Sequence, residues 1–304
     1  MMFRFNQLSV IAFPVCISRK RETLYSVNLL YYTKRFNMPH ETETNMSEGE
    51  IRTISMQQWI KVIFISCVVI QILLVLCDYV FNYIDIFDDK SIRRIWNIAR
   101  ENSIPTWFSS MQAQVLGVTV FLIAIVQSRR ISRIKMWSWF LVGFFFLWIG
   151  IDDVAELHEK LGGALERMVT KDNEEPGGLI GFLLKNPSFS WHTFIAPVFA
   201  LCGLGIVAFL WTAFWRLNLA RYLVLGFGCW VMAQSLDFIE GLDNIDDFYD
   251  SIKEYLSIKR SYGVPHTFKV VEEVLEMFGT TLLWVGFLHY FATVANGLQI
   301  RLTK

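Results

Sequence analysis

Six long stretches of the chain contain almost no charged residues, and this feature restricts the possible folds more than any other. Residues 62–77 and 102–128 have no charged side chain at all. Further apolar stretches lie within 136–151, 186–215, 222–236 and 277–300. An α-helix needs about 20 mostly apolar residues to cross about 30 Å of hydrocarbon. The sequence therefore predicts an all-α fold, a polytopic transmembrane helical bundle of about six spans.

The composition agrees with a lipid environment. Of the 304 residues, 54% are hydrophobic and 15% aromatic, whereas 18% are charged, a balance that a soluble domain of this size would hardly tolerate. The 28 basic and 28 acidic residues cancel, so net charge gives no reason to expect a nucleic-acid partner. The five cysteines show no CxxC spacing, which argues against a disulfide or zinc-finger framework. The predicted partner is the lipid bilayer.

The first part of the chain differs from the rest. Residues 1–21 carry four basic and no acidic side chains, a pattern found in organellar targeting peptides and also by chance. The polar stretch 40–50 resembles a flexible tail. We therefore predict a disordered or targeting extension over 1–55, a six-helix transmembrane domain over 56–300, and a short tail at 301–304.

Basic residues in the connections predict the orientation in the membrane. The connection 129–135 holds four basic residues and no acid, the next such turn holds Arg216 and Arg221, and the tail holds Arg301 and Lys304. With six spans these segments fall on one side, and basic residues are enriched on the cytoplasmic side. We expect an integral membrane protein with both termini on the cytoplasmic or matrix-equivalent side, in a membrane that the sequence does not identify.

Two predicted spans are too short unless they include an acid. The apolar stretch of the third span ends just before Asp152, and that of the fifth ends just before Asp237. A carboxylate inside hydrocarbon costs on the order of 2.5–3.5 kcal/mol, so a bound cation, a shared proton or a water-filled cavity should compensate it. Acids at helix ends can also face interfacial water, which leaves a purely structural network as the alternative.

Ionisable residues from four predicted helices share one layer near the outer face. A rotation of about 100° per residue lets the third, fifth and sixth helices each direct two or more acids toward a common centre, and the fourth helix begins with a histidine. The candidate metal ligands are Asp152, Glu156, Glu159, His192, Asp237, Glu240, Glu272 and Glu276. His158 lies about 120° around its helix from Asp152, so it fits an interfacial residue as well as a ligand.

Carboxylates and histidines from separate helices form the ligand sets of di-iron and di-manganese centres. The layer therefore favours a metal-dependent membrane enzyme that binds divalent iron, manganese or zinc and acts on a lipid or other apolar substrate. The usual Glu-x-x-His motif is missing. A zinc hydrolase that uses His158, His192 and His266 is a variant, although no His-x-x-x-His pair supports it.

Two other functions remain open. A proton- or cation-coupled transporter or channel would use the same acids, but the inner halves of the helices contain few polar residues, which favours a one-sided site. A non-catalytic assembly subunit would be recognised by its protein partners. The chain has no Walker-type loop, GxSxG or HExxH motif, so neither ATP-driven transport nor hydrolysis by those motifs is indicated.

Five motifs together resemble an uncharacterised family of bacterial multi-pass membrane proteins. They are NIARENSIPTWFSS (97–110), IDDVAELHEKLGG (151–163), WHTFIAPVF (191–199), LDFIEG (236–241) and VVEEVLEMFG (270–279). The resemblance covers about residues 75–295, and it implies the membrane architecture and the polar positions without supplying a reaction. Such relatives tend to have Asp-Glu after the third apolar stretch, whereas this chain has Asp152 and Asp153.

Overall fold

A computed structural model describes residues 55–84, 86, 89–169, 188–242, 244–256 and 263–295. All of them belong to one compact unit, Arg52–Lys304. The predicted extension, apart from Ser55, and the predicted tail lie outside the described residues. Within the described residues all regular secondary structure is helical, which confirms the all-α prediction.

Six helices are long and apolar enough to cross a membrane, as predicted. They are α1 (Met56–Asp78), continued by the π-helical turn η1 (Tyr79–Ile84), then α3 (Ile104–Gln127), α4 (Arg133–Ala155), α8 (Ala196–Trp215), α9 (Ala220–Glu240) and α11 (Gly263–Val294). The last of them begins far ahead of the uncharged stretch at Met277 and so includes the acidic turns before it.

Side-chain caps fix where several spans begin. Ser55 accepts a hydrogen bond from the backbone N–H of Gln58, whose side chain bonds back, and the pair forms a capping box at the start of α1. Ser103 caps α3 in the same way, with Pro105 in the first turn. Ser132 caps α4. Local sequence therefore positions these helix starts independently of tertiary packing.

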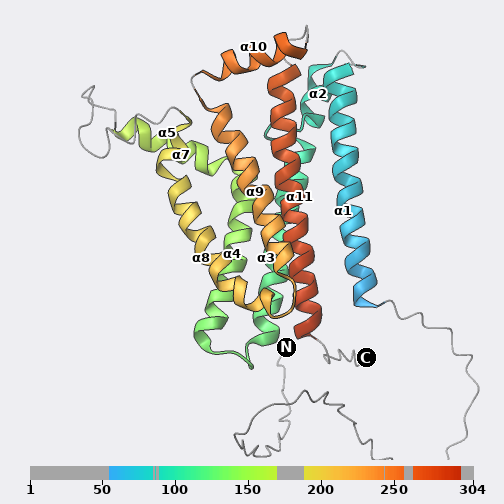
Figure 1. Ribbon diagram of the computed structural model, residues 1–304, viewed down its shortest axis with the longest axis vertical. Helices are drawn as coiled ribbons and strands as arrows, with labels where there is room; N and C mark the ends of the chain where they lie inside the picture. The colour runs from blue at the N-terminus through green and yellow to red at the C-terminus, as the bar shows by residue number, and fades with distance from the viewer. Residues whose placement is uncertain are drawn as a thin grey trace, which may run out of the picture. The chain divides into compact units, whose positions relative to one another are not determined.

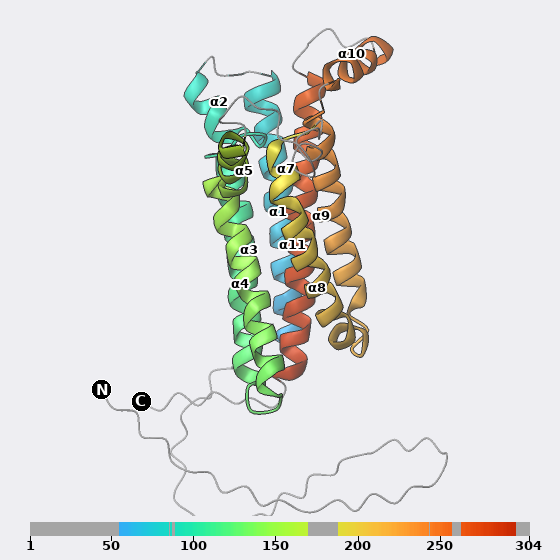
Figure 2. The same cartoon turned by 90° about the vertical axis from the view of Figure 1, so that its left-hand side faces the viewer.

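Four shorter helices lie at one end of the bundle (Figures 1 and 2). They are α2 (Lys90–Trp96), α5 (Leu157–Val169), α7 (Ser190–Phe194) and α10 (Ile245–Leu256). The tight connections from α3 to α4 and from α8 to α9 lie at the opposite end. We call the end with the short helices the polar end. Because the spans alternate in direction, the last turns of α1, α4 and α9 and the first turns of α3, α8 and α11 all lie there.

The apolar core lies in the half away from the polar end. Val120 of α3, Trp139 of α4, Phe214 of α8 and Phe287 of α11 are buried together there. Helix α3 packs along α4, and α11 packs along α9 and α3. A Cβ atom added at Gly279 of α11 would lie 2.8 Å from a backbone oxygen of α9, so a small residue is needed for this close approach.

Polar side chains connect spans inside the bundle. Gln71 of α1 and Gln112 of α3 each donate a hydrogen bond of 2.8 Å to the Thr281 hydroxyl of α11. Gln127 of α3 donates to the Tyr290 hydroxyl at 3.1 Å. Such interhelical hydrogen bonds in a membrane contribute on the order of 0.5–2 kcal/mol each. They fix the lateral positions of α1, α3 and α11, which carry much of the polar end.

Candidate functional site

The third span ends in a left-handed turn at Glu156. This residue has φ 51° and ψ 39°, an uncommon conformation for a residue with a side chain. Helix α4 therefore stops at Ala155, and α5 starts at Leu157 in a new direction. The expectation of one continuous helix through Glu159 is wrong, because it placed Asp152, Glu156 and Glu159 by helical spacing alone.

The turn brings His158 back onto Asp152. The two residues form a hydrogen-bonded pair, with Nδ1 of His158 2.7 Å from Oδ2 of Asp152. The backbone N–H of His158 donates to the other oxygen, Oδ1, at 2.9 Å. Within the described residues Nε2 of His158 has no hydrogen bond. Straight helical spacing would have kept these two side chains about 120° apart, so only the turn makes the pair possible.

Electrostatics favour the charged form of His158. Burial lowers the pKa of His158, but the hydrogen bond and charge of Asp152 outweigh burial and raise this pKa above its usual 6.5. A histidine with one nitrogen held by a carboxylate and the other available has the arrangement of a general acid–base group.

Helix α7 places a second histidine beside a carboxylate. Nε2 of His192 lies 3.3 Å from Oδ2 of Asp237, within ion-pair distance but without the angle of a hydrogen bond. The His192 side chain is 8% exposed. Trp191 lies between the two histidines, with ring centroids 4.6 Å from His158 and 4.0 Å from His192. Gly162 of α5 permits this packing, since a Cβ there would lie 2.6 Å from the backbone of Trp191.

A half-buried lysine lies among three of the predicted ligands. Nζ of Lys269 is 2.8 Å from Glu272, 3.5 Å from Asp237 and 3.9 Å from Glu240. We call Lys269 and these three acids the Lys269 cluster. One oxygen from each acid lies within 4.8 Å of the others, close enough for a shared metal ion. The lysine already supplies a compensating positive charge at this position.

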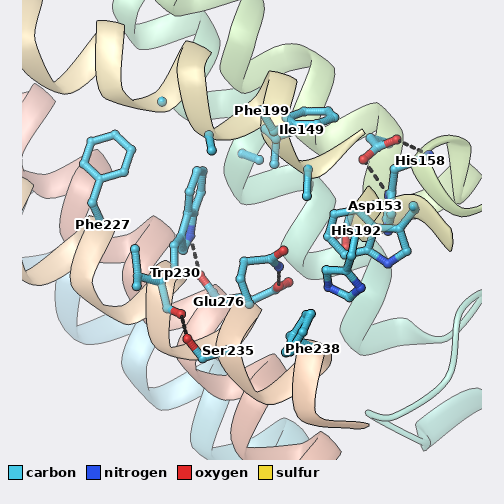
Figure 3. A pocket seen from close by; sticks show the side chains of 18 of the residues that line it. Ile149, Asp153, His158, His192, Phe199, Phe227, Trp230, Ser235, Phe238 and Glu276 are labelled. Atoms are coloured by element: carbon cyan, nitrogen blue, oxygen red, sulfur yellow. Dashed lines mark hydrogen bonds and ion pairs between the residues drawn. The ribbon is translucent and has the colours of Figure 1, made fainter. Parts of the chain in front are cut away.

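A cavity of about 720 Å³ opens beside these groups. Its walls are mostly apolar and come from α3, α4, α8, α9 and α11, with Phe145, Phe199 and Phe227 among them. Figure 3 shows His158, His192 and Asp153 at one end of it, Phe227 at the far end and Glu276 between them. The cavity therefore has an amphipathic lining.

Two acids of this cavity have no basic partner. We call them the cavity acids, Asp153 of α4 and Glu276 of α11, and their charges interact with each other. Oδ2 of Asp153 is buried without a hydrogen bond. Glu276 accepts a hydrogen bond of 3.0 Å from the amide of Gln234. Within the described residues neither acid forms an ion pair, in contrast to the acids of the Lys269 cluster.

Glu101, in the connection between α2 and α3, adds a third uncompensated acid. Its Oε2 is buried without a hydrogen bond. Burial, followed by repulsion from Glu156 and Glu159, raises the pKa of Glu101 to about 7. Its charge also interacts with that of Glu276, so this connection contributes to the field at the polar end.

The structure separates the eight predicted ligands into groups. The Lys269 cluster contains three of them, with His192 in contact, and the cavity lining contains Asp152, His192 and Glu276. Glu156 is half-buried beside Lys160 at 3.5 Å, and Glu159 is exposed. His266, an expected zinc ligand of the hydrolase variant, instead lies 2.8 Å from Asp78 of α1.

Three important residues were absent from the predicted site: Asp153, Glu101 and Lys269. Lys269 had a usable signal, because it precedes Glu272 by three residues, the spacing of neighbours on one helix face. The sequence signal for Asp153 was weaker, because it was only that this residue follows another acid, Asp152. Glu101 lies in a connection between helices, where sequence spacing gives no direction for the side chain.

A bundle of six apolar helices with an acidic and histidine-containing layer at one end defines a multi-pass integral membrane protein. The chain belongs to the family described as Domain of unknown function (DUF8692), whose model matches residues 62–291. The match includes most of each of the six spans and agrees with the resemblance to an uncharacterised family. Comparisons with curated proteins and with solved structures found no match.

Proposed function

We propose that this protein is a membrane-embedded enzyme that performs acid–base chemistry on the polar part of a lipid-like substrate held in the cavity. The observation that carries the proposal is the lining of the cavity, which is apolar along its walls and has the Asp152–His158 pair at one end. Concave apolar sites with a few convergent polar groups and a titrating histidine are typical of small-molecule enzymes.

The pair supports a defined chemical role. Asp152 accepts from Nδ1 of His158, which leaves Nε2 as the nitrogen that exchanges protons with a substrate or water. The carboxylate also stabilises the imidazolium that forms when Nε2 takes a proton. Trp191, in edge contact with His158, restricts the orientation of the imidazole ring. The apolar walls exclude water from the rest of the substrate, which strengthens electrostatic interactions at the polar end.

The proposed enzyme also has a metal-dependent form, in which a divalent ion is bound beside the cavity. Asp237, Glu240 and Glu272 are the residues that would hold iron, manganese or zinc, with His192 adjacent. Such an ion would act as a Lewis acid or lower the pKa of a bound water. Lys269 opposes this form, because its ammonium group lies among the same oxygens and a metal would have to displace it.

Elemental analysis of the detergent-purified protein tests the metal. The metal-dependent form predicts near-stoichiometric iron, manganese or zinc that falls in Asp237→Asn and stays in Asp246→Asn, an exposed acid of α10. A metal-free protein that remains folded, with a melting temperature indifferent to chelator, would contradict the metal-dependent form and leave the acid–base proposal standing.

Lipid profiling by mass spectrometry tests the enzyme. Membranes that contain the wild-type protein should show a change in one lipid class relative to membranes without it, and His158→Gln should abolish that change. His289→Gln is the matched control, since His289 lies on α11 against Tyr222 and does not line the cavity. Identical lipid profiles for wild type and His158→Gln would contradict the proposal.

A coupled transporter is less well supported. It would require the polar layer to continue across the bundle, but in the described spans the half away from the polar end is filled by the apolar core around Val120, Phe214 and Phe287. The three acids of the cavity lining, Asp152, Asp153 and Glu276, lie outside that core. This one-sided arrangement favours binding and chemistry over passage through the bundle.

A further inference from the structure

The charges that line the cavity all have one sign apart from histidine. Asp152, Asp153 and Glu276 are its acidic residues, and none of its described lining residues is a lysine or arginine. Asp152 is compensated by His158, and the acids of the neighbouring Lys269 cluster are compensated by their lysine. Among the described residues, Asp153 and Glu276 are the acids that face the cavity without a basic partner.

Uncompensated buried carboxylates are costly in an apolar environment, so their position next to a cavity suggests that a ligand supplies the missing charge. Three buried polar atoms of the lining also lack a hydrogen bond: Oδ2 of Asp153, Nε1 of Trp191 and Nε2 of His192. The side chain of His192 is more than nine-tenths buried. The site therefore has both charge and hydrogen-bonding capacity available for a ligand.

A chelated metal ion does not fit this position well. Metal sites built from carboxylates normally use three or more protein ligands whose oxygens lie close together. Within the described residues the acids that meet this condition are Asp237, Glu240 and Glu272, and neither cavity acid belongs to that group. An ammonium group needs only two or three acceptors and can bring an apolar chain with it.

We propose that the cavity binds a single-chain amphiphile whose polar end is a protonated amine, with Asp153 and Glu276 as its counter-ions. The volume of about 720 Å³ lies inside the range of roughly 300–1,000 Å³ that holds one molecule of drug size. The chain lies along the apolar walls, which include Phe145, Phe199 and Phe227. Phe227 lies at the end of the cavity far from the two histidines (Figure 3). Anionic head groups are excluded by like-charge repulsion. The inference names the substrate class for the proposed enzyme and rests on that function.

Photolabelling of the full-length protein in phosphatidylcholine nanodiscs tests whether the cavity prefers an amine head group. Three probes share one hexadecyl chain with a diazirine near its end, and they carry a primary amine, a hydroxyl or a phosphate. The amine probe should label α4, α8 and α9 saturably, and unlabelled hexadecylamine should compete at about tenfold lower concentration than hexadecanol or hexadecyl phosphate. Equal competition by the three compounds, or preference for the phosphate, would overturn the proposal.

Two sets of variants localise the labelling. Asp153→Asn with Glu276→Gln should remove the preference for the amine while leaving labelling by the alcohol. Gly203→Leu should block labelling by every probe, because Gly203 lines the cavity and an added Cβ would meet no atom within 4 Å. Gly205→Leu is the matched control, since Gly205 has equally open space but lies outside the lining.

The outcomes separate the two proposals. Amine-selective labelling without any lipid change that depends on His158 would support the binding site and contradict the enzyme. A lipid change that depends on His158, together with equal labelling by the three head groups, would support the enzyme. It would overturn the proposal that the cavity prefers an amine. Labelling by the amine that persists unchanged in Gly203→Leu would show that the probe binds elsewhere, and it would also overturn the proposal.

Discussion

The Lys269 cluster and the cavity acids lie at the same end of the bundle, but they balance their charge in different ways. In the cluster Lys269 lies within 4 Å of three carboxylates from α9 and α11. Asp153 and Glu276 have no such partner and face a cavity. The comparison teaches that the depth of an acid does not by itself indicate function. Acids neutralised by the protein support the structure, and acids left without a cation are the ones available to a ligand.

Removal of the lysine should have the largest effect on stability. Lys269→Met leaves the buried carboxylates of Asp237 and Glu272 and the half-buried carboxylate of Glu240 without their cation, and breaking a buried ion pair in this way costs about 3–5 kcal/mol. The measurement is the free energy of unfolding in mixed micelles. Lys160→Met is the control, since Lys160 is exposed beside Glu156 and its loss should cost at most about 0.5 kcal/mol. Equal losses would show that the cluster does not depend on its lysine.

Neutral substitutions of one acid from the Lys269 cluster and of one cavity acid should change the free energy of unfolding by different amounts. Asp237→Asn weakens contacts with His192 and Lys269 and should lower the free energy of unfolding by about 2 kcal/mol. Asp153→Asn removes a charge that has no basic partner among the described residues, so it should leave stability unchanged or raise it by up to about 1 kcal/mol. A loss in Asp153→Asn as large as that in Asp237→Asn would remove the distinction between the two groups.

Glu101 should make stability depend on pH near neutrality. Its pKa in the folded protein, about 7, lies above the usual 4.5. Between these values the unfolded chain ionises while the folded protein keeps the neutral form, so the wild type loses stability as pH rises through this window. Glu101→Gln should not lose stability in this way. Above pH 7 its free energy of unfolding should exceed that of the wild type by about 1–2 kcal/mol, and below pH 4.5 the two should be equal.

Melting temperatures measured across this pH range would show the difference. Asp246→Asn serves as the control, because Asp246 is exposed on α10 and is not among the acids that raise the pKa of Glu101. Parallel melting curves for Glu101→Gln and the wild type at every pH would contradict the buried position of this carboxylate.

The smallest effect concerns the turn that forms the Asp152–His158 pair. Glu156 has a positive φ, and glycine adopts that conformation without steric cost. Glu156→Gly should therefore raise the free energy of unfolding by about 0.5–1 kcal/mol and preserve the pair, whereas Glu156→Val should lower it. Loss of stability in both variants would mean that the contact with Lys160 matters more than the backbone.

The sequence was sufficient for the architecture because uncharged stretches report directly on the bilayer. It also located the polar layer, since alternating spans bring the acids of α4, α9 and α11 to one end regardless of packing detail. The sequence did not predict the contacts within that layer. The approach of His158 to Asp152 depends on one left-handed residue, and nothing in the local sequence required Glu156 to adopt it.

The role of Lys269 shows a second limit. Lys269 was not among the predicted site residues, and the apolar stretch of the last predicted span began only at Met277. In the structure α11 extends back to Gly263, so Lys269 belongs to the span and faces Asp237 of another helix. Whether a charged turn continues a helix or leaves it depends on tertiary contacts, and hydropathy does not report those.

The length of α11 sets how the protein fits its membrane. A helix of 32 residues is about 48 Å long, and the hydrocarbon layer is about 30 Å thick. If the hydrocarbon begins at Val294, a layer of about 30 Å ends near Glu276, and the charged first turns then project beyond it. Hydrophobic mismatch acts on this boundary, at a fraction of a kcal/mol per Å. A thicker bilayer would draw the Lys269 cluster into a drier environment, so the acyl-chain length of the host lipids controls how well hydrated the site is.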